Sequence, residues 1–241
     1  MPSKLRAIFF DAGNTLVYPR CEELAGDLTA QGLPATIEDF FVAERAGKSK
    51  LDEWLWPQIR NGEVPRTIDQ YYWGEYLRTL MDQIRAPEEA RGELMLRVAN
   101  GFRDIKLWSR VLPETPAYLE NLRGRGYFLG VISNSNGTIE EQLGRVDLLR
   151  YFHTVLDSAI VGMEKPHPQI FRLATGRAGV APSEAIFIGD THSTDVGGAQ
   201  LAGIHGVLID RVGAYPNIGS PRITSLPELD KILEEFSLPA V

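Results

Sequence analysis

Cysteine, positive charge and long apolar runs are all scarce in this chain, and each scarcity excludes something. The 241 residues include one cysteine, Cys21, so no disulfide can form within the chain. Lysine and arginine number 25 against 32 aspartate and glutamate, and the net charge of −7 gives no electrostatic support for binding nucleic acid or a membrane surface. The apolar run in MPSKLRAIFF is too short for a signal peptide, and no segment approaches a membrane span. We therefore expect a soluble cytoplasmic protein.

Short apolar runs with strand character recur along the chain, separated by segments with helical periodicity. They lie at 6–10, 127–133, 153–157, 185–189 and 206–209. Because these runs do not alternate with polar residues, both faces of each strand are expected to be covered. Strands of this kind between helices are typical of a parallel sheet. The sequence predicts an α/β fold with a Rossmann-like, doubly wound parallel sheet as its core.

The segment 19–105 has helical character instead. Thr36 with Asp39 is typical of a helix start, and no strand-like run stands out. We therefore expect two domains: a core formed by 1–18 and 106–241, and a helical insertion formed by 19–105. Aromatic residues in the insertion either wall a substrate pocket or pack its core, and helical spacing favours packing. They are Trp54, Trp56, Tyr71, Tyr72, Trp73 and Tyr76.

Four polar clusters are predicted to meet at one edge of the sheet, where ligands of such sheets bind. They are Asp11 after the first strand, Ser133–Asn134 after the second, Lys165 before a helix, and Asp190 with Asp195. Each cluster alone is explained as well by a turn or a helix cap. Together they offer a carboxylate nucleophile, a hydroxyl, an ammonium group and an acidic pair. This combination indicates a site for a phosphoryl group and a divalent cation.

The order and spacing of FFDAGNTL, VISN, GMEKPHPQIF and GDTHSTDVGGAQLAG resemble the four motifs of the haloacid dehalogenase-like hydrolase superfamily. The motifs span residues 7 to 203, and the helical insertion lies where members with an α-helical cap carry that cap. The resemblance implies a Mg²⁺-dependent hydrolase of a small, anionic phosphorylated metabolite. It leaves the identity of that substrate open.

The resemblance also implies a role for each motif residue. Asp11 is the expected nucleophile, forming an aspartyl-phosphate intermediate that water later cleaves, and Thr15 is expected to help orient it. Ser133, the backbone N–H of Asn134, and Lys165 are expected to bind the phosphoryl oxygens and stabilise the charge of the transition state.

Mg²⁺ is expected to bind Asp11, Asp190 and Asp195 together with the backbone carbonyl of Gly13. At position 13, family phosphatases carry a second aspartate that protonates the leaving oxygen and then activates water. Glycine keeps the carbonyl but cannot transfer a proton. A general acid/base contributes about 10² to 10⁴ in rate, so alkyl phosphates should suffer more than aryl or acyl phosphates. Gly13→Asp is expected to raise alkyl phosphate turnover, provided the side chain fits.

Candidate replacements for the missing acid are His192 and Glu164, although loop or surface roles are favoured for both. Asn14 can donate a hydrogen bond but cannot exchange a proton at neutral pH.

Three alternatives to a phosphatase remain open. 2-Haloacid dehalogenases also lack the second acid, but they resemble this chain less where it carries Asp190 and Phe171. Phosphonoacetaldehyde hydrolases carry a Schiff-base lysine in the cap, for which Lys48 and Lys50 are candidates, although solvated charges are the favoured interpretation. The third alternative is a non-catalytic relative that binds a phosphorylated ligand or a protein. The intact set of buried polar residues weighs against it, since burying unused like charges is costly.

Overall fold

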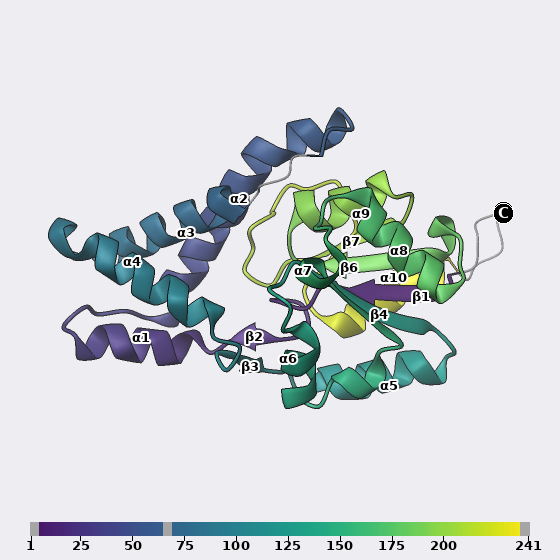
Figure 1. The fold of residues 1–241 in the computed structure, drawn as a ribbon, viewed down its shortest axis with the longest axis horizontal. Helices are drawn as coiled ribbons and strands as arrows, with labels where there is room; N and C mark the ends of the chain where they lie inside the picture. The colour runs from purple at the N-terminus through teal and green to yellow at the C-terminus, as the bar shows by residue number, and fades with distance from the viewer. Residues whose placement is uncertain (1–4, 65–68, 237–241) are drawn as a thin grey trace.

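The computed structural model describes residues 5–64 and 69–236. Its core is a six-stranded parallel sheet in the order β5-β4-β1-β6-β7-β8 (Figure 1). The strands are β1 (Ala7–Phe10), β4 (Phe128–Ser133), β5 (Thr154–Asp157), β6 (Ala185–Gly189), β7 (His205–Ile209) and β8 (Arg222–Ile223). The predicted fold class is confirmed, and β8 is an additional edge strand of two residues.

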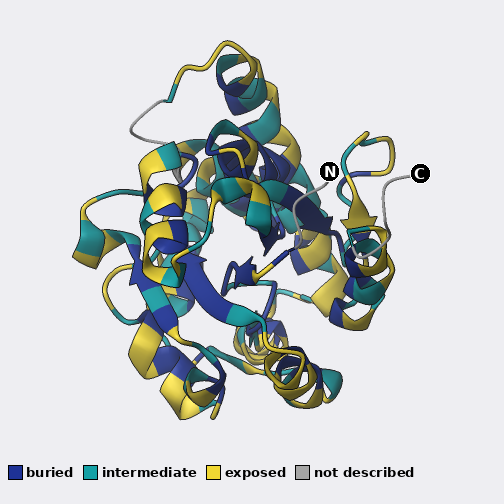
Figure 2. Ribbon diagram, turned by 90° about the vertical axis from the view of Figure 1, so that its right-hand side faces the viewer, coloured by how far each residue is buried: buried dark blue, intermediate teal, exposed yellow. Residues whose placement is uncertain are grey.

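Helices cover both faces of the sheet, as the uninterrupted apolar strands require. Along β1, Ile8 and Phe10 belong to one apolar cluster while Ala7 and Phe9 belong to another, because successive side chains point to opposite faces. The central strands are accordingly buried on both sides (Figure 2). One face is covered by α5 (Glu114–Gly124), α6 (Ile139–Arg145) and α10 (Leu229–Glu235), and the other by α8 (Pro168–Ala178) and α9 (Gly198–Leu201).

A helical insert projects from one end of the core (Figure 1). It comprises α1 (Cys21–Ala30), α2 (Ile37–Arg60), α3 (Asp69–Gln83) and α4 (Glu88–Arg103). As predicted, α2 begins after Thr36, whose backbone N–H donates to the Asp39 carboxylate at 2.7 Å. The insert has its own apolar cluster, which includes Phe40, Tyr76 and Leu80. The division into domains at 18/19 and 105/106 remains a prediction.

The chain passes between insert and core through a short antiparallel pair, β2 (Tyr18–Pro19) and β3 (Trp108–Arg110). The sequence did not indicate this pair, since strands of two or three residues leave no periodic pattern. The pair holds the two connections side by side. Among the described residues, no helix combines the length and apolar character needed to cross a membrane.

Candidate active site

Asp11 lies at the carboxyl end of β1, where the chain turns sharply. Its backbone N–H still donates to the Ile188 carbonyl at 2.8 Å, so the sheet fixes its position. The turn closes on Ala12, whose carbonyl accepts the N–H groups of both Leu16 and Val17. Asn14 has a φ of 52°, a left-handed conformation that asparagine tolerates better than most residues. The turn therefore presents the Asp11 carboxylate at the edge of the sheet.

Lys165 lies between two aspartates at that edge. Its Nζ is 2.6 Å from Asp11 Oδ1 and 2.7 Å from Asp195 Oδ1, and all three side chains are almost fully buried. Asn134 holds the Lys165 backbone in place: its Oδ1 accepts the Lys165 N–H at 2.7 Å and its Nδ2 donates to the Lys165 carbonyl at 2.9 Å. The sequence predicts a role for the Asn134 backbone N–H, and these side-chain hydrogen bonds are an additional role.

Asp195 is fixed by a close approach to the end of β6. Its Oδ2 accepts the Thr191 N–H at 2.9 Å. A Cβ added to Gly189 would lie only 2.4 Å from that same oxygen, so any side chain at position 189 would displace the carboxylate. Asp190 follows Gly189 directly, and the two acids therefore leave the sheet edge at neighbouring positions.

Burial raises the pKa of Asp11 to about 7. Lys165 offsets part of this rise, while the nearby carboxylates of Asp195 and Asp190 add to it. Burial also raises the pKa of Asp195, again partly offset by Lys165. Lys165 therefore neutralises only part of the negative charge of these buried carboxyl groups.

Lys48 does not occupy the solvated position favoured from the sequence. It is buried, not solvated, with its Nζ 2.6 Å from Glu44 Oε1 and 2.9 Å from Asp190 Oδ2. Lys50, by contrast, is exposed and paired with Glu53, as expected. The spacing of Glu44 and Lys48 on one helix could have suggested their pairing. Their contact with Asp190 depends on how α2 packs against the core, which no local pattern shows.

The face of α2 that carries Lys48 packs along the loop after β6. Asp52 accepts hydrogen bonds from the backbone and hydroxyl of Ser193. The ring centroids of Trp56 and His192 are 4.0 Å apart. His192 is thus buried between the insert and the core, and its Nε2 lies 3.1 Å from Ser220 Oγ. The expectation of a surface position for His192 is therefore wrong, although the residue does lie in the segment that follows β6.

The carboxylates of Asp11, Asp190 and Asp195 suit a divalent cation of the Mg²⁺ type. With the neighbouring Glu44, four carboxyl groups face two ammonium groups here, and the excess negative charge equals that of one divalent ion when all are ionised. They are Asp11, Glu44, Asp190 and Asp195 against Lys48 and Lys165. Within the described ranges, no three such side chains are already gathered as a metal site, and Lys165 lies between two of the expected ligands.

Gly13 has a neighbour that explains its lack of a side chain. A Cβ at position 13 would lie 3.1 Å from Trp108 Cζ3. The Trp108 ring is itself held in place, because its Nε1 donates to the Phe102 carbonyl at 2.9 Å. A side chain at position 13 would therefore require the Trp108 ring to shift by a few tenths of an ångström.

Two other expected residues lie at the same edge. Ser133 ends β4 and is buried. Thr15 is buried as well, but its Oγ1 has no hydrogen-bond partner among the described residues, so its hydroxyl makes no bond to Asp11.

Cys21 is buried, and burial raises its pKa to about 12, which keeps it in the thiol form at neutral pH.

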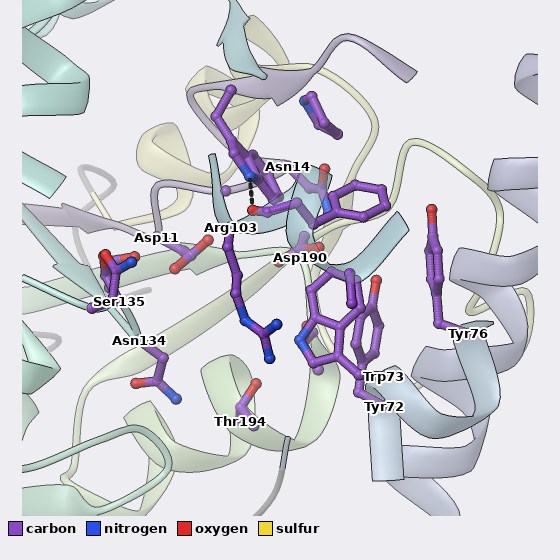
Figure 3. Close-up of a pocket in the computed structure, with 18 of the residues that line it drawn as sticks. Asp11, Asn14, Tyr72, Trp73, Tyr76, Arg103, Asn134, Ser135, Asp190 and Thr194 are labelled. Atoms are coloured by element: carbon purple, nitrogen blue, oxygen red, sulfur yellow. Dashed lines mark hydrogen bonds between the residues drawn. The ribbon is translucent and has the colours of Figure 1, made fainter. Parts of the chain in front are cut away.

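A cavity of about 900 Å³ opens above these side chains, between the core and the insert. Its floor includes Asp11 and Asp190, and α3 supplies an aromatic wall with Tyr72, Trp73 and Tyr76 (Figure 3). Arg103, at the end of α4, extends its guanidinium group between the core side and this wall (Figure 3). Some insert aromatics thus serve both functions considered above, packing the insert and lining the cavity.

Comparison with known proteins reveals relatives along almost the whole chain. The glyceraldehyde 3-phosphate phosphatase of Methanopyrus kandleri is 28% identical, over 94% of this chain and 92% of its own length. The (S)-2-haloacid dehalogenase 4A of Burkholderia cepacia is 29% identical, over 97% and 96% respectively. The magnesium-bound crystal structure of the HAD-hydrolase YfnB from Bacillus subtilis matches with a TM-score of 0.65 and 20% identity, over 96% of this chain and 99% of that one.

Overall identity does not separate the phosphatase from the dehalogenase, so that choice depends on the site. The family is shown more directly, because the model of the haloacid dehalogenase-like hydrolases matches residues 5–203. This chain therefore belongs to the haloacid dehalogenase-like hydrolase family and is an enzyme, a hydrolase.

Proposed function

We propose that this hydrolase releases phosphate from a small phosphorylated metabolite, with Mg²⁺ as its cofactor and Asp11 as the nucleophile. The observation that carries the proposal is the cluster of Asp11, Lys165 and Asp195, joined by contacts of 2.6 and 2.7 Å at the floor of the cavity. A carboxylate nucleophile beside a fixed ammonium group suits attack on an anionic phosphoryl centre. Relatives named as phosphatases, including the Methanopyrus kandleri protein, support the assignment.

The residues would act as follows. An oxygen of Asp11 attacks phosphorus while the ester bond to the leaving oxygen breaks, giving an aspartyl phosphate. Lys165 and Ser133 bind the phosphoryl oxygens, and Asn134 keeps Lys165 in position through its two bonds to the lysine backbone. Water then attacks phosphorus and restores Asp11. The insert lines one side of the cavity, and its closure over a bound substrate would exclude bulk water.

Asp11, Asp190, Asp195 and the Gly13 carbonyl would hold Mg²⁺. When bound, Mg²⁺ neutralises charge on the site and on the phosphoryl group. Arg103 provides a further positive charge beside the cavity, which suits an anionic substrate. These assignments of individual residues are part of the proposal.

The acidic residues favour a phosphatase over a dehalogenase. A dehalogenase binds no metal and gains nothing from burying Asp190 and Asp195 beside its nucleophile, whereas a metal-dependent phosphatase needs those oxygens.

Lys48 disfavours a Schiff-base mechanism. Burial alone would lower its pKa, but the carboxylates of Asp190 and Glu44 outweigh burial and raise the pKa well above the ordinary value. A lysine attacks a carbonyl group only as the neutral amine. Lys48 is therefore held in the form that cannot form a Schiff base.

A substrate panel tests the function. We expect the purified enzyme to release phosphate from 4-nitrophenyl phosphate and acetyl phosphate in Mg²⁺, and to lose this activity in EDTA because the buried carboxylates then lack their cation. Phosphate release is measured for these esters and for ethyl phosphate, with chloride release from 2-chloropropionate in parallel. Chloride release that persists in EDTA would establish a dehalogenase instead.

The contact between Gly13 and Trp108 revises the expectation for Gly13→Asp. We expect this single substitution to lower the melting temperature without raising ethyl phosphate turnover, because the new Cβ would meet the held Trp108 ring. In the double variant with Trp108→Ala the carboxyl group has space, and ethyl phosphate turnover should rise more than 4-nitrophenyl phosphate turnover. Trp108→Ala alone is the control. A gain in the single variant would show that Trp108 yields easily.

A further inference from the structure

Glu44 is a largely buried carboxylic acid that the insert contributes to the cavity. It lies on α2, its side chain is only 12% exposed, and it lines the same cavity as Asp11 and Gly13. It belongs to none of the four motifs, and neither the expected metal site nor the phosphate-binding group includes it.

Lys48 fixes the Glu44 carboxylate relative to the core. One ammonium group contacts Glu44 Oε1 at 2.6 Å and Asp190 Oδ2 at 2.9 Å. The two carboxylates are therefore separated by a single nitrogen atom, and Asp190 leaves the sheet edge beside Asp11. This bridge links Glu44 to Asp190 while α2 is packed against the core, and Glu44 and Asp11 line the same cavity.

Position 13 and His192 are less well placed for proton transfer. Position 13 has no side chain, and the Trp108 ring lies close beside it. His192 is buried between Trp56 and the core and does not belong to the cavity lining. Glu164 lines the cavity from the core, next to Lys165. Glu44 lines the cavity from the insert and is linked through Lys48 to Asp190.

We infer that Glu44 transfers the protons in this reaction in place of the absent acid, and that Lys48 positions it; this inference depends on the proposed phosphatase function. In the first step Asp11 bonds to phosphorus, the ester P–O bond breaks, and the leaving oxygen takes the proton of the Glu44 carboxyl group to give an alcohol. In the second step water bonds to phosphorus, Glu44 takes its proton, and the P–O bond to Asp11 breaks.

The environment of Glu44 suits an acid that must be protonated for part of the cycle. Burial raises its pKa, Lys48 offsets part of the rise, and Asp190 adds to it. A proton donor works best when its pKa lies near the working pH.

Glu44→Gln tests the inference through the leaving group. We expect kcat/KM for ethyl phosphate to fall by about 10²-fold or more, and kcat/KM for 4-nitrophenyl phosphate to fall by less than about 10-fold, because nitrophenolate leaves without a proton. The kcat for 4-nitrophenyl phosphate should nevertheless fall, since the aspartyl phosphate then hydrolyses slowly. A rapid burst of about one nitrophenolate per enzyme should precede that slow turnover.

Three comparisons keep the result interpretable. Glu53→Gln, at an exposed position of the same helix, should leave both esters unaffected. The melting temperature of each variant reports whether it folds. Adding formate to Glu44→Ala should restore part of the ethyl phosphate activity, which a purely structural role would not allow.

Equal losses on both esters, or no loss on either, would overturn the inference. The same leaving-group pattern in Glu164→Gln with Glu44→Gln unaffected would transfer the role to Glu164. If the wild-type enzyme released no phosphate from any ester, the proposed function itself would fail, and with it this inference. That outcome is recognised in the wild-type enzyme before any variant is made.

Discussion

Replacing Asp11 with asparagine is expected to lower kcat for phosphate release by about 10⁴-fold or more, because the variant has no carboxylate to form the covalent intermediate. The amide has almost the same shape, so the cavity and the position of Lys165 should change little. The rate is measured as phosphate released from 4-nitrophenyl phosphate in Mg²⁺.

The same substitution should not destabilise the fold in EDTA. The pKa of Asp11 is about 7 in the folded protein, above its ordinary value of 3.8, so ionising this side chain costs stability as pH rises through that interval. A neutral amide removes this cost, and the melting temperature at pH 8 should be unchanged or higher. Asp27→Asn, on an exposed face of α1, is the control for both measurements. Retained turnover in Asp11→Asn would place the nucleophile elsewhere.

Lys165→Met is expected to have the second-largest effect, on both activity and stability. It removes the one ammonium group between Asp11 and Asp195, so buried carboxylates lose their partner at contacts of 2.6 and 2.7 Å. Breaking a buried ion pair from one side costs about 3–5 kcal/mol, and we expect a loss of this size in the free energy of unfolding in EDTA. Turnover should fall by about 10²- to 10³-fold.

Mg²⁺ should stabilise Lys165→Met more than it stabilises the wild type, because the variant offers the ion more negative charge to neutralise. Urea unfolding in Mg²⁺ and in EDTA measures this difference, with the exposed Lys231→Met as the control. Equal stabilisation of both proteins by Mg²⁺ would contradict a metal site that includes Asp11 and Asp195.

The sheet could be predicted because its strands carry their information locally. The run that contains Ile8 and Phe10 is apolar without interruption, and strands buried on both faces have this pattern. The pair β2 and β3 could not be predicted, because strands of two or three residues are too short to show an alternating pattern of apolar residues. The motif residues could be assembled at one edge because parallel strands end together, whatever the loops between them do.

Contacts between the insert and the core could not be predicted in the same way. Lys48 meets Asp190 across a long stretch of sequence, and this contact depends on how α2 packs against the core. Trp108 and Gly13 are also far apart in sequence, and their approach depends on where β3 returns the chain to the core. Neither contact follows from a local pattern. The sequence revealed that position 13 lacks an acid. Only the structure shows that the Trp108 ring lies beside position 13 and that Glu44 lines the same cavity.

The close approach of Trp108 to Gly13 limits how position 13 can change in evolution. An acid gained at position 13 by one mutation would place its Cβ 3.1 Å from the indole ring, so the ring would have to shift. Losing the indole first would leave a cavity and remove the hydrogen-bond donor of the Phe102 carbonyl, which is also unfavourable. Each path back to an acid begins with a strained or less well packed protein. We therefore expect Gly13 and Trp108 to be retained or lost together among relatives of this chain.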